Sequence, residues 1–145
     1  MAKPGIGSEV FLDTAFAIAL SSPKDHLHGR AALLAGQLQE AGTRLVTTRA
    51  VVLEIGNALC KERYRAAAVR LLSALEGDPA VEVVPLSESL YARALQLYRE
   101  RPDKEWGLTD CVSFVVMEDR GLGEALTTDE HFAQAGFRAL LREDG

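Results

Sequence analysis

The sequence predicts an α/β domain with a mainly parallel central sheet of four to five strands. Two observations predict this fold class: short apolar runs alternate with longer segments of helical periodicity, and turn residues separate the two kinds of segment. Such alternation is typical of βαβ units, in which crossover helices join parallel strands. The 145 residues contain no internal repeat or linker, so we expect one domain over 1–145, with residues 1–7 as a flexible tail.

The first half of the chain contains two expected strands and the helices that follow them. The apolar run EVFLD (9–13) predicts the first strand, and leucines at helical spacing predict a helix from about 25 to 41. The run RLVTT (44–48) predicts the second strand. The apolar positions after this strand recur with a helical period, which predicts one helix over 50–64 and another over roughly 65–75.

The second half of the chain continues the alternation after a turn at GDP (77–79). The expected elements are, in order, a strand at 81–86, a helix at 88–100, a helix at 109–120, a strand at 124–128, a short helical turn near 130–135 and a final apolar segment at 137–141. The helix at 109–120 contains seven residues, Cys111 to Met117, of which only Ser113 is polar, so we expect that helix to be buried.

The composition limits the classes of function. A formal net charge of -5 excludes an overall basic surface for binding duplex nucleic acid, but it is compatible with an acidic site that reaches phosphates through metal ions. Two cysteines, Cys60 and Cys111, are too few for a disulfide framework, so we expect a reducing compartment, the cytoplasm. The apolar run from Val10 to Leu20 is too short to span a bilayer, so we expect no membrane association.

Four carboxylates are expected at one edge of the sheet. Asp13 closes the first strand, Glu54 lies in the first turns of the helix after the second strand, Asp110 begins the buried helix, and Asp129 follows the fourth strand. In a parallel α/β sheet the C-terminal ends of strands and the N-terminal ends of crossover helices share one edge, and ligands bind there. The sequence therefore predicts that four distant segments contribute acids to one pocket.

Converging carboxylates require positive charge. Without a partner, like charge and burial would raise the pKa values of some of these groups and keep them protonated. An all-oxygen ligand set suits Mg²⁺ or Mn²⁺ better than Zn²⁺. A few acids in fixed positions around such ions are what hydrolysis of a phosphodiester bond needs. The pattern therefore favours a metal-dependent phosphodiesterase.

Each acid also has an ordinary structural explanation. Asp13 and Asp129 are typical residues for capping the turn or helix that follows them. Asp110 stands where a helix N-terminus favours a negative charge. Glu54 lies on a helix, where a carboxylate usually faces solvent. The sequence leaves these alternatives open, and they do not exclude metal binding.

Further polar residues stand beside the acids and serve either the site or local structure. The candidates for orienting a carboxylate or a metal-bound water are Thr14, Asn57, Thr109 and Thr128, and Asp103 is a candidate fifth acid in a polar loop. Thr109 is equally a candidate N-cap. Arg49 is a candidate for contacting a substrate phosphate. His131, close to Asp129, is expected to be a structural hydrogen-bonding residue.

Four stretches of the sequence resemble the PIN domain, in particular the bacterial and archaeal toxins of the VapC type. They are FLDTA, TTRAVVLEIGNAL, WGLTDCVSFVVM and ALTTDEHFAQAGF, and the resemblance covers about 8–141. It implies a three-layer α/β/α PIN-like domain. The acidic quartet of the family falls on Asp13, Glu54, Asp110 and Asp129.

The resemblance implies an endoribonuclease that depends on Mg²⁺ or Mn²⁺, a cognate antitoxin that blocks the site, and a homodimer. On this reading RNA is the substrate, Asp13, Glu54 and Asp110 hold the main ion, and Asp129 holds a second ion or positions the water. The alternative is a non-catalytic PIN-fold binding module that acts through a protein or RNA partner. The presence of all four acids argues against that alternative.

A basic run continues from the helix that carries Glu54. It contains Lys61, Arg63, Arg65 and Arg70. Such a run is usually a solvated face. The functional alternative is contact with RNA phosphates or with an acidic segment of an antitoxin.

Overall fold

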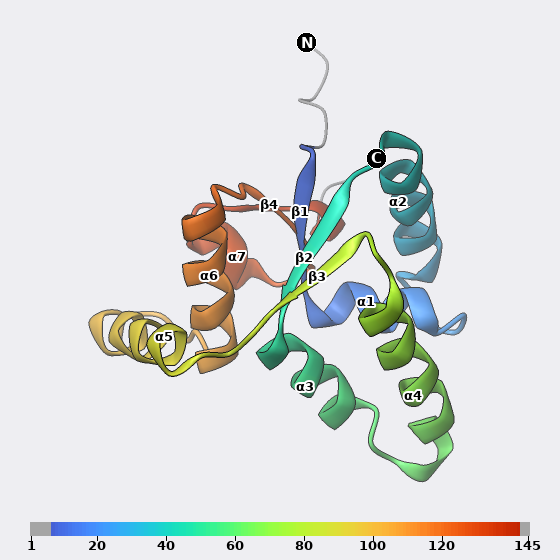
Figure 1. Ribbon diagram of the computed structural model, residues 1–145, viewed down its shortest axis with the longest axis horizontal. Helices are drawn as coiled ribbons and strands as arrows, with labels where there is room; N and C mark the ends of the chain where they lie inside the picture. The colour runs from blue at the N-terminus through green and yellow to red at the C-terminus, as the bar shows by residue number, and fades with distance from the viewer. Residues whose placement is uncertain (1–6, 143–145) are drawn as a thin grey trace.

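The computed structural model describes residues 7–142 and is built around a five-stranded parallel sheet (Figure 1). The strands are β1 (Glu9–Leu12), β2 (Arg44–Thr48), β3 (Val81–Val84), β4 (Glu124–Leu126) and β5 (Arg138–Ala139). Their order across the sheet is β3-β2-β1-β4-β5, and all four neighbouring pairs are parallel. The predicted α/β class and strand number are confirmed.

Seven α-helices among the described residues cover the sheet. They are α1 (Thr14–Ser21), α2 (His28–Ala41), α3 (Arg49–Ala58), α4 (Glu62–Gly77), α5 (Glu88–Glu100), α6 (Leu108–Arg120) and α7 (Glu130–Gln134). In Figure 1, α1, α2 and α4 lie on one side of the sheet and α5, α6 and α7 lie on the other, which gives three layers. Helix α3 extends from the end of β2.

Local sequence explains several boundaries of these elements. Thr48 caps α3, because its hydroxyl accepts a hydrogen bond from the Val51 N–H at 3.1 Å. Gly42 ends α2 and Gly121 ends α6, both in the left-handed conformation that glycine adopts without steric penalty. The strand predicted over 81–86 already ends at Val84, since the following proline has no N–H with which to continue a ladder.

One helix was missed in the sequence, and two helix predictions had wrong bounds. Helix α1 was not predicted, because its apolar residues are consecutive and show no helical period. Helix α2 begins at His28 and not near residue 25. The helix predicted over 50–64 is broken into α3 and α4 at residues 59–61, and α4 then extends to Gly77. The break contains neither glycine nor proline, so the sequence carries no signal for it.

The core lies on both faces of the sheet. All seven residues from Cys111 to Met117 in α6 are buried, as predicted, and the Ser113 hydroxyl donates a hydrogen bond to the Thr109 carbonyl at 3.0 Å. Most of the described buried apolar residues form one cluster that includes residues of this helix, β1 and β4. Among the described residues, no helix combines the length and apolar character that crossing a membrane requires.

The tail predicted over 1–7 lies outside the described residues except for Gly7. The Gly7 N–H donates a hydrogen bond to Glu124 Oε1 at 2.7 Å, which connects this residue to the start of β4.

Candidate metal centre

The direction of the chain across the sheet reverses between β1 and β4. From β1 the chain adds β2 and then β3 on one side, and it then returns to add β4 and β5 on the other. The last residues of the two central strands, Leu12 and Leu126, pair with each other. In open α/β sheets the crevice beyond such a reversal is where ligands bind. The four predicted acids come from segments around this point.

Asp13 is a buried carboxylate directly after β1. Its side chain is 7% exposed and accepts a hydrogen bond from the Thr127 hydroxyl at 2.7 Å. Although Asp13 occupies the N-cap position of α1, its side chain makes no capping hydrogen bond. The ordinary explanation of this residue as a helix cap therefore does not apply.

The pKa of Asp13 is raised from 3.8 to about 6. Burial is the largest cause, and the negative charges of Glu54 and Asp110 raise the pKa further. The hydrogen bonds from the Thr127 hydroxyl and from the Thr14 backbone act in the opposite direction. The ionised form of Asp13 is thus disfavoured until positive charge is brought to the site.

Glu54 reaches the same site from the exposed side of α3. Its Oε1 accepts a hydrogen bond from the Thr14 hydroxyl at 2.5 Å. Because Thr14 is the first residue of α1, this bond connects the segment after β1 to the segment after β2. Thr14 was predicted to orient a carboxylate, and its hydroxyl contacts one of the four acids, Glu54.

Asp110 and Asp129 are held by His131. The Nδ1 atom of His131 lies 3.0 Å from Asp110 Oδ2 and 3.2 Å from Asp129 Oδ1. Both carboxylates also cap helices: Asp110 Oδ2 accepts from the Gly107 N–H at 3.1 Å, and Asp129 Oδ1 accepts from the His131 N–H at 2.8 Å. Burial, with the charge of Asp129, raises the pKa of Asp110, and hydrogen bonds from Gly107 and His131 oppose the rise.

The capping role and a metal-binding role are compatible because each carboxylate has two oxygens. Hydrogen bonds from the described residues fall on a single oxygen in Glu54, Asp110 and Asp129. The second oxygen of each side chain receives none from the described part of the chain. One potential ligand atom from each of Asp110, Asp129 and His131 lies within 4.8 Å of the others, close enough to share one ion.

The donor set fits a divalent cation. Carboxylate oxygens are the preferred ligands of Mg²⁺ and Mn²⁺, and the imidazole of His131 is a further ligand that can bind Mn²⁺. A cation beside Asp13 would counter both the burial and the like charge that raise the pKa of this group. The arrangement can hold an ion at the reversal point of the sheet.

Comparison with known proteins identifies the family. Residues 10–138 match the model of the PIN domain. The chain belongs to the PIN domain family. It is also similar to VapC20 of Mycobacterium tuberculosis, described as a 23S rRNA-specific endonuclease, with 28% identity over 128 residues that make up 88% of this chain and 95% of VapC20.

Three solved structures have a similar fold. The crystal structure of M. tuberculosis VapC20, described as a sarcin-ricin loop cleaving toxin, matches with a TM-score of 0.77 and 27% identity and covers 88% of this chain and 95% of its own. VapBC2 from Rickettsia felis, bound to a DNA fragment from its promoter, matches with a TM-score of 0.68 and 11% identity over 90% and 96% of the two chains. FitAcB from Neisseria gonorrhoeae matches with a TM-score of 0.63 and 18% identity over 90% and 94%. At these identities the last two comparisons establish the fold alone.

One polar residue beside the acids was missed in the sequence. Thr127 donates to Asp13 and accepts from the Asp129 N–H at 3.0 Å, so it joins two of the acids. The predicted residue was the neighbouring Thr128, whose carbonyl accepts a hydrogen bond from Arg142 Nη1 at 3.1 Å. The pairing of Leu12 with Leu126 decides which threonine lies beside Asp13, and no local pattern reveals that register. His131 was expected to be a structural hydrogen-bonding residue close to Asp129, and its contacts with Asp110 and Asp129 agree with that expectation.

The other candidates have different surroundings. Asp103 is exposed and paired with Arg101, with contacts of 3.0 and 2.9 Å. Arg49 is paired with Glu76 on α4 and, among the described residues, forms no hydrogen bond or ion pair with the four acids. Asn57 is exposed. The N-cap of α6 is Gly107, so the capping role considered for Thr109 was wrong.

Proposed function

We propose that this PIN protein is an endoribonuclease that depends on Mg²⁺ or Mn²⁺ and is the toxin of a type II toxin–antitoxin pair. The observation that carries the proposal is the convergence of Asp13, Glu54, Asp110 and Asp129 at the reversal point of the sheet. The similarity to VapC20, a 23S rRNA-specific endonuclease, supports RNA as the substrate.

The four acids would hold the metal, and the surrounding residues would fix their orientation. A bound divalent ion supplies an activated water and neutralises the negative charge that develops on the phosphate. Asp13 would lose its proton on metal binding, with Thr127 holding one carboxylate oxygen. Thr14 orients Glu54, and His131 holds the remaining two acids at a fixed separation.

The proposal includes a cognate antitoxin, a homodimer and a cytoplasmic location. The resemblance to VapC-type toxins supports the first two, and the two unpaired cysteines are consistent with a reducing compartment. Co-expression with the product of the adjacent gene should give a stable complex in which RNA cleavage is suppressed. Light scattering of the purified chain should give twice the mass of one chain, and the mass of a single chain would contradict the dimer.

The first experiment measures cleavage of ribosomal RNA. The substrate is 23S rRNA with its sarcin–ricin loop, since these are the targets named for VapC20. We expect cleavage with Mn²⁺ or Mg²⁺, none with EDTA, and a loss of at least about 100-fold in kcat/KM for Asp13→Asn and Asp110→Asn, which corresponds to about 2.7 kcal/mol of transition-state stabilisation.

The matched control is Asp103→Asn. It makes the same chemical change at an exposed carboxylate that is paired with Arg101, and it should cleave like the wild type. Binding of Mn²⁺, seen as a thermal shift, without cleavage of any RNA would favour the non-catalytic binding module. A wild-type chain with no thermal shift in either ion would contradict the metal centre itself.

A further inference from the structure

The connection between α3 and α4 projects from the edge of the sheet that carries the four acids (Figure 1). We call residues 59–70 the α3–α4 arm; they include the link between the two helices and the first turns of α4. Every residue from Cys60 to Ala66 is exposed. The arm is therefore free to contact another molecule along its outer end.

The arm concentrates positive charge in a chain whose net charge is -5. It contains Lys61, Arg63, Arg65 and Arg70, and its one acid is Glu62. Within the described residues, none of these four basic side chains forms an ion pair. A group of unpaired cations so close together in an acidic protein favours a negatively charged ligand.

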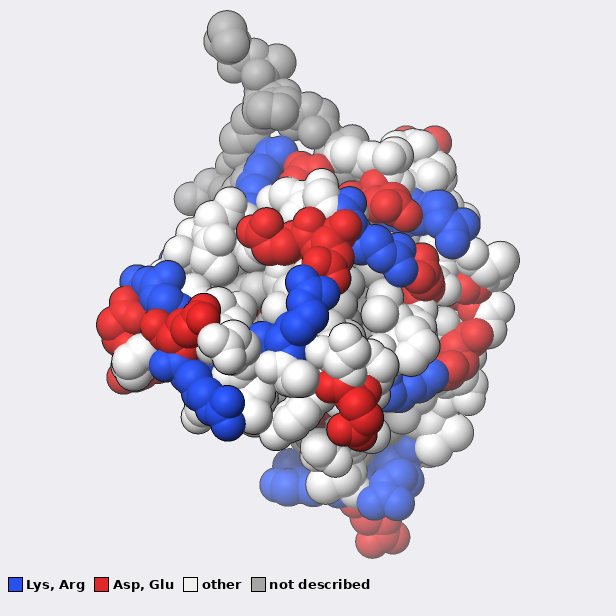
Figure 2. All heavy atoms as spheres, turned by 60° about the vertical axis from the view of Figure 1, so that its left-hand side comes forward, with Lys and Arg blue, Asp and Glu red and all other residues white. Residues whose placement is uncertain are grey.

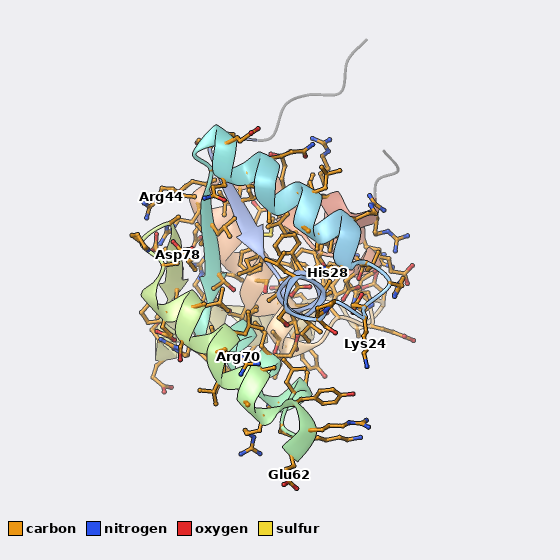
Figure 3. The ribbon with its side chains drawn as sticks, turned by 90° about the vertical axis from the view of Figure 1, so that its right-hand side faces the viewer. Lys24, His28, Arg44, Glu62, Arg70 and Asp78 are labelled. Carbon is orange, nitrogen blue, oxygen red and sulfur yellow. The ribbon has the colours of Figure 1, made fainter. Side chains whose placement is uncertain are left out.

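Five of the eleven other Lys and Arg residues that the structure describes form ion pairs with acids of the protein itself. Arg93 is paired with Asp119, Arg101 with Asp103, and Arg120 with Glu82. In Figure 2 positive and negative groups are intermixed over the body of the molecule. The lowest part of the same view, where the arm lies, carries positive groups with a negative group at its very end. Figure 3 places Glu62 at the outer end of α4 and Arg70 part-way along that helix.

The arm also presents flat groups suited to nucleobases. The guanidinium of Arg63 lies 4.7 Å from the centroid of the Tyr64 ring, and Tyr64 is 41% exposed. The side chain of Arg65 donates two hydrogen bonds to the Cys60 carbonyl, at 3.2 and 2.6 Å, which holds the link against α4. Aromatic rings and arginine planes are the surfaces on which unpaired RNA bases stack.

The arm lies close enough to the acids for one RNA strand to contact both. Seven residues separate Glu54 from Lys61: helix rise to the end of α3 and an extended link beyond it give a separation of at most about 16 Å. This length corresponds to a few nucleotides. A strand whose phosphate lies at the acids can therefore continue along the arm.

We propose that the α3–α4 arm binds single-stranded RNA beside the bond that is cut, with Lys61 and Arg63 contacting phosphates and Tyr64 stacking on a base. The inference rests on the proposed ribonuclease function. Arg65 shapes the arm through its bonds to Cys60, and Arg70 extends the positive surface along α4. The acidic centre itself repels phosphates until metal is bound, so this arm supplies attraction that the four acids cannot.

The test measures binding apart from cleavage. Every protein carries Asp13→Asn so that RNA is not cut, and fluorescence anisotropy follows a labelled single-stranded oligoribonucleotide at several salt concentrations. Lys61→Gln with Arg63→Gln should weaken binding by at least 5-fold and reduce the slope of log affinity against log salt by about 1.4, since each phosphate contact contributes about 0.7.

Tyr64→Ala should weaken binding by about 5-fold or more without changing the slope, whereas Tyr64→Phe should bind normally.

The matched control is Arg44→Gln with Arg99→Gln, which removes the same charge from two exposed positions outside the arm. Its affinity should fall less than 2-fold. Circular dichroism and melting temperatures of all variants should match those of the Asp13→Asn protein from which they are made, because every further substituted side chain is exposed. A loss of affinity in the control equal to that in the arm variant would overturn the inference, since net charge alone would then explain binding.

Three further results separate this inference from the proposed function. If the chain with Asp13 intact cleaves RNA, and the arm variants bind and cleave like the control, the arm inference fails while the ribonuclease stands. If the arm variants bind RNA normally but lose affinity for the antitoxin, the arm is a protein-binding surface and the inference is again overturned. Absence of any RNA cleavage by the wild type contradicts the proposed function, whatever the arm does.

Discussion

At the scale of single residues, Asp13 carries an electrostatic penalty that a bound cation would relieve. The carboxylate is buried, lies near the charges of Glu54 and Asp110, and has only hydrogen bonds to favour its ionised form. Its pKa of about 6 means that the metal-free protein carries an electrostatic penalty at neutral pH. The penalty is a measurable property of the fold, apart from any activity.

Replacement of Asp13 by Asn should stabilise the metal-free protein at pH 8. Between the unfolded pKa of 3.8 and the folded pKa of about 6 the native state binds more protons, so the free energy of unfolding falls as pH rises through this window. Above the window the loss is complete and amounts to about 3 kcal/mol, at 1.36 kcal/mol per pKa unit. An asparagine at position 13 does not ionise and avoids this loss. In chemical denaturation, the free energy of unfolding of Asp13→Asn should therefore exceed that of the wild type by a large amount at pH 8 and by a small amount near pH 4.

The control for this prediction is Asp103→Asn, which alters an exposed carboxylate and should show no such pH-dependent gain. A metal-free Asp13→Asn protein that is less stable than the wild type at pH 8 would show that Asp13 is not under electrostatic strain.

Thr127→Val should weaken metal binding and the fold together. Valine keeps the shape of threonine but removes the buried hydroxyl that donates to Asp13 and accepts from Asp129. Loss of a partner from a buried polar group lowers the free energy of unfolding by about 1–3 kcal/mol, and loss of a residue that orients a metal ligand lowers metal affinity by about 10–100-fold. Urea denaturation and Mn²⁺ titration measure the two effects.

Thr127→Ser restores the hydroxyl and provides the comparison, with metal affinity close to that of the wild type. Equal metal affinity in the valine and serine variants would mean that Thr127 does not orient the site.

At the scale of elements, the local sequence accounts for helix ends better than for helix continuity. Gly42 and Gly121 end their helices in a conformation that glycine favours, and both helix ends agree with the sequence pattern. The break between α3 and α4 has no such residue, and the arm depends on that break. The apolar spacing predicted one helix over 50–64. Periodicity shows which face of a helix is apolar, but it does not show where one helix ends and another begins in a new direction.

Two glycines of α2 should respond in opposite ways to alanine. Gly36 lies inside the helix with open space around its Cα, so Gly36→Ala should raise the free energy of unfolding by about 0.5–1 kcal/mol. Gly42 has a φ of 68°, which a Cβ makes unfavourable, so Gly42→Ala should lower the free energy of unfolding by about 1 kcal/mol. Thermal denaturation of the two variants measures both changes. Stabilisation by Gly42→Ala would mean that the end of α2 can rearrange.

At the scale of the whole molecule, metal binding and stability should be coupled through pH. Because a metal ligand must be deprotonated, ion binding competes with the proton on Asp13. The rise in melting temperature produced by a fixed Mn²⁺ concentration should therefore be greater at pH 8 than at pH 5, and the difference should be smaller in Asp13→Asn, where only the raised pKa of Asp110 remains. Equal shifts at the two pH values in the wild type would contradict a role for Asp13 as a ligand.

The sequence by itself determined the α/β class, the approximate positions of the first four strands, the burial of α6 and the four acids at strand and helix ends. These features depend on local patterns: apolar runs, turn residues, and the rule that strand ends and helix starts share an edge. Only the tertiary structure decided that Thr127 and not Thr128 contacts Asp13, that His131 holds Asp110 and Asp129, and that the chain bends into an exposed basic arm after Ala58. These facts depend on strand register and helix direction, which contacts between residues far apart in the chain determine.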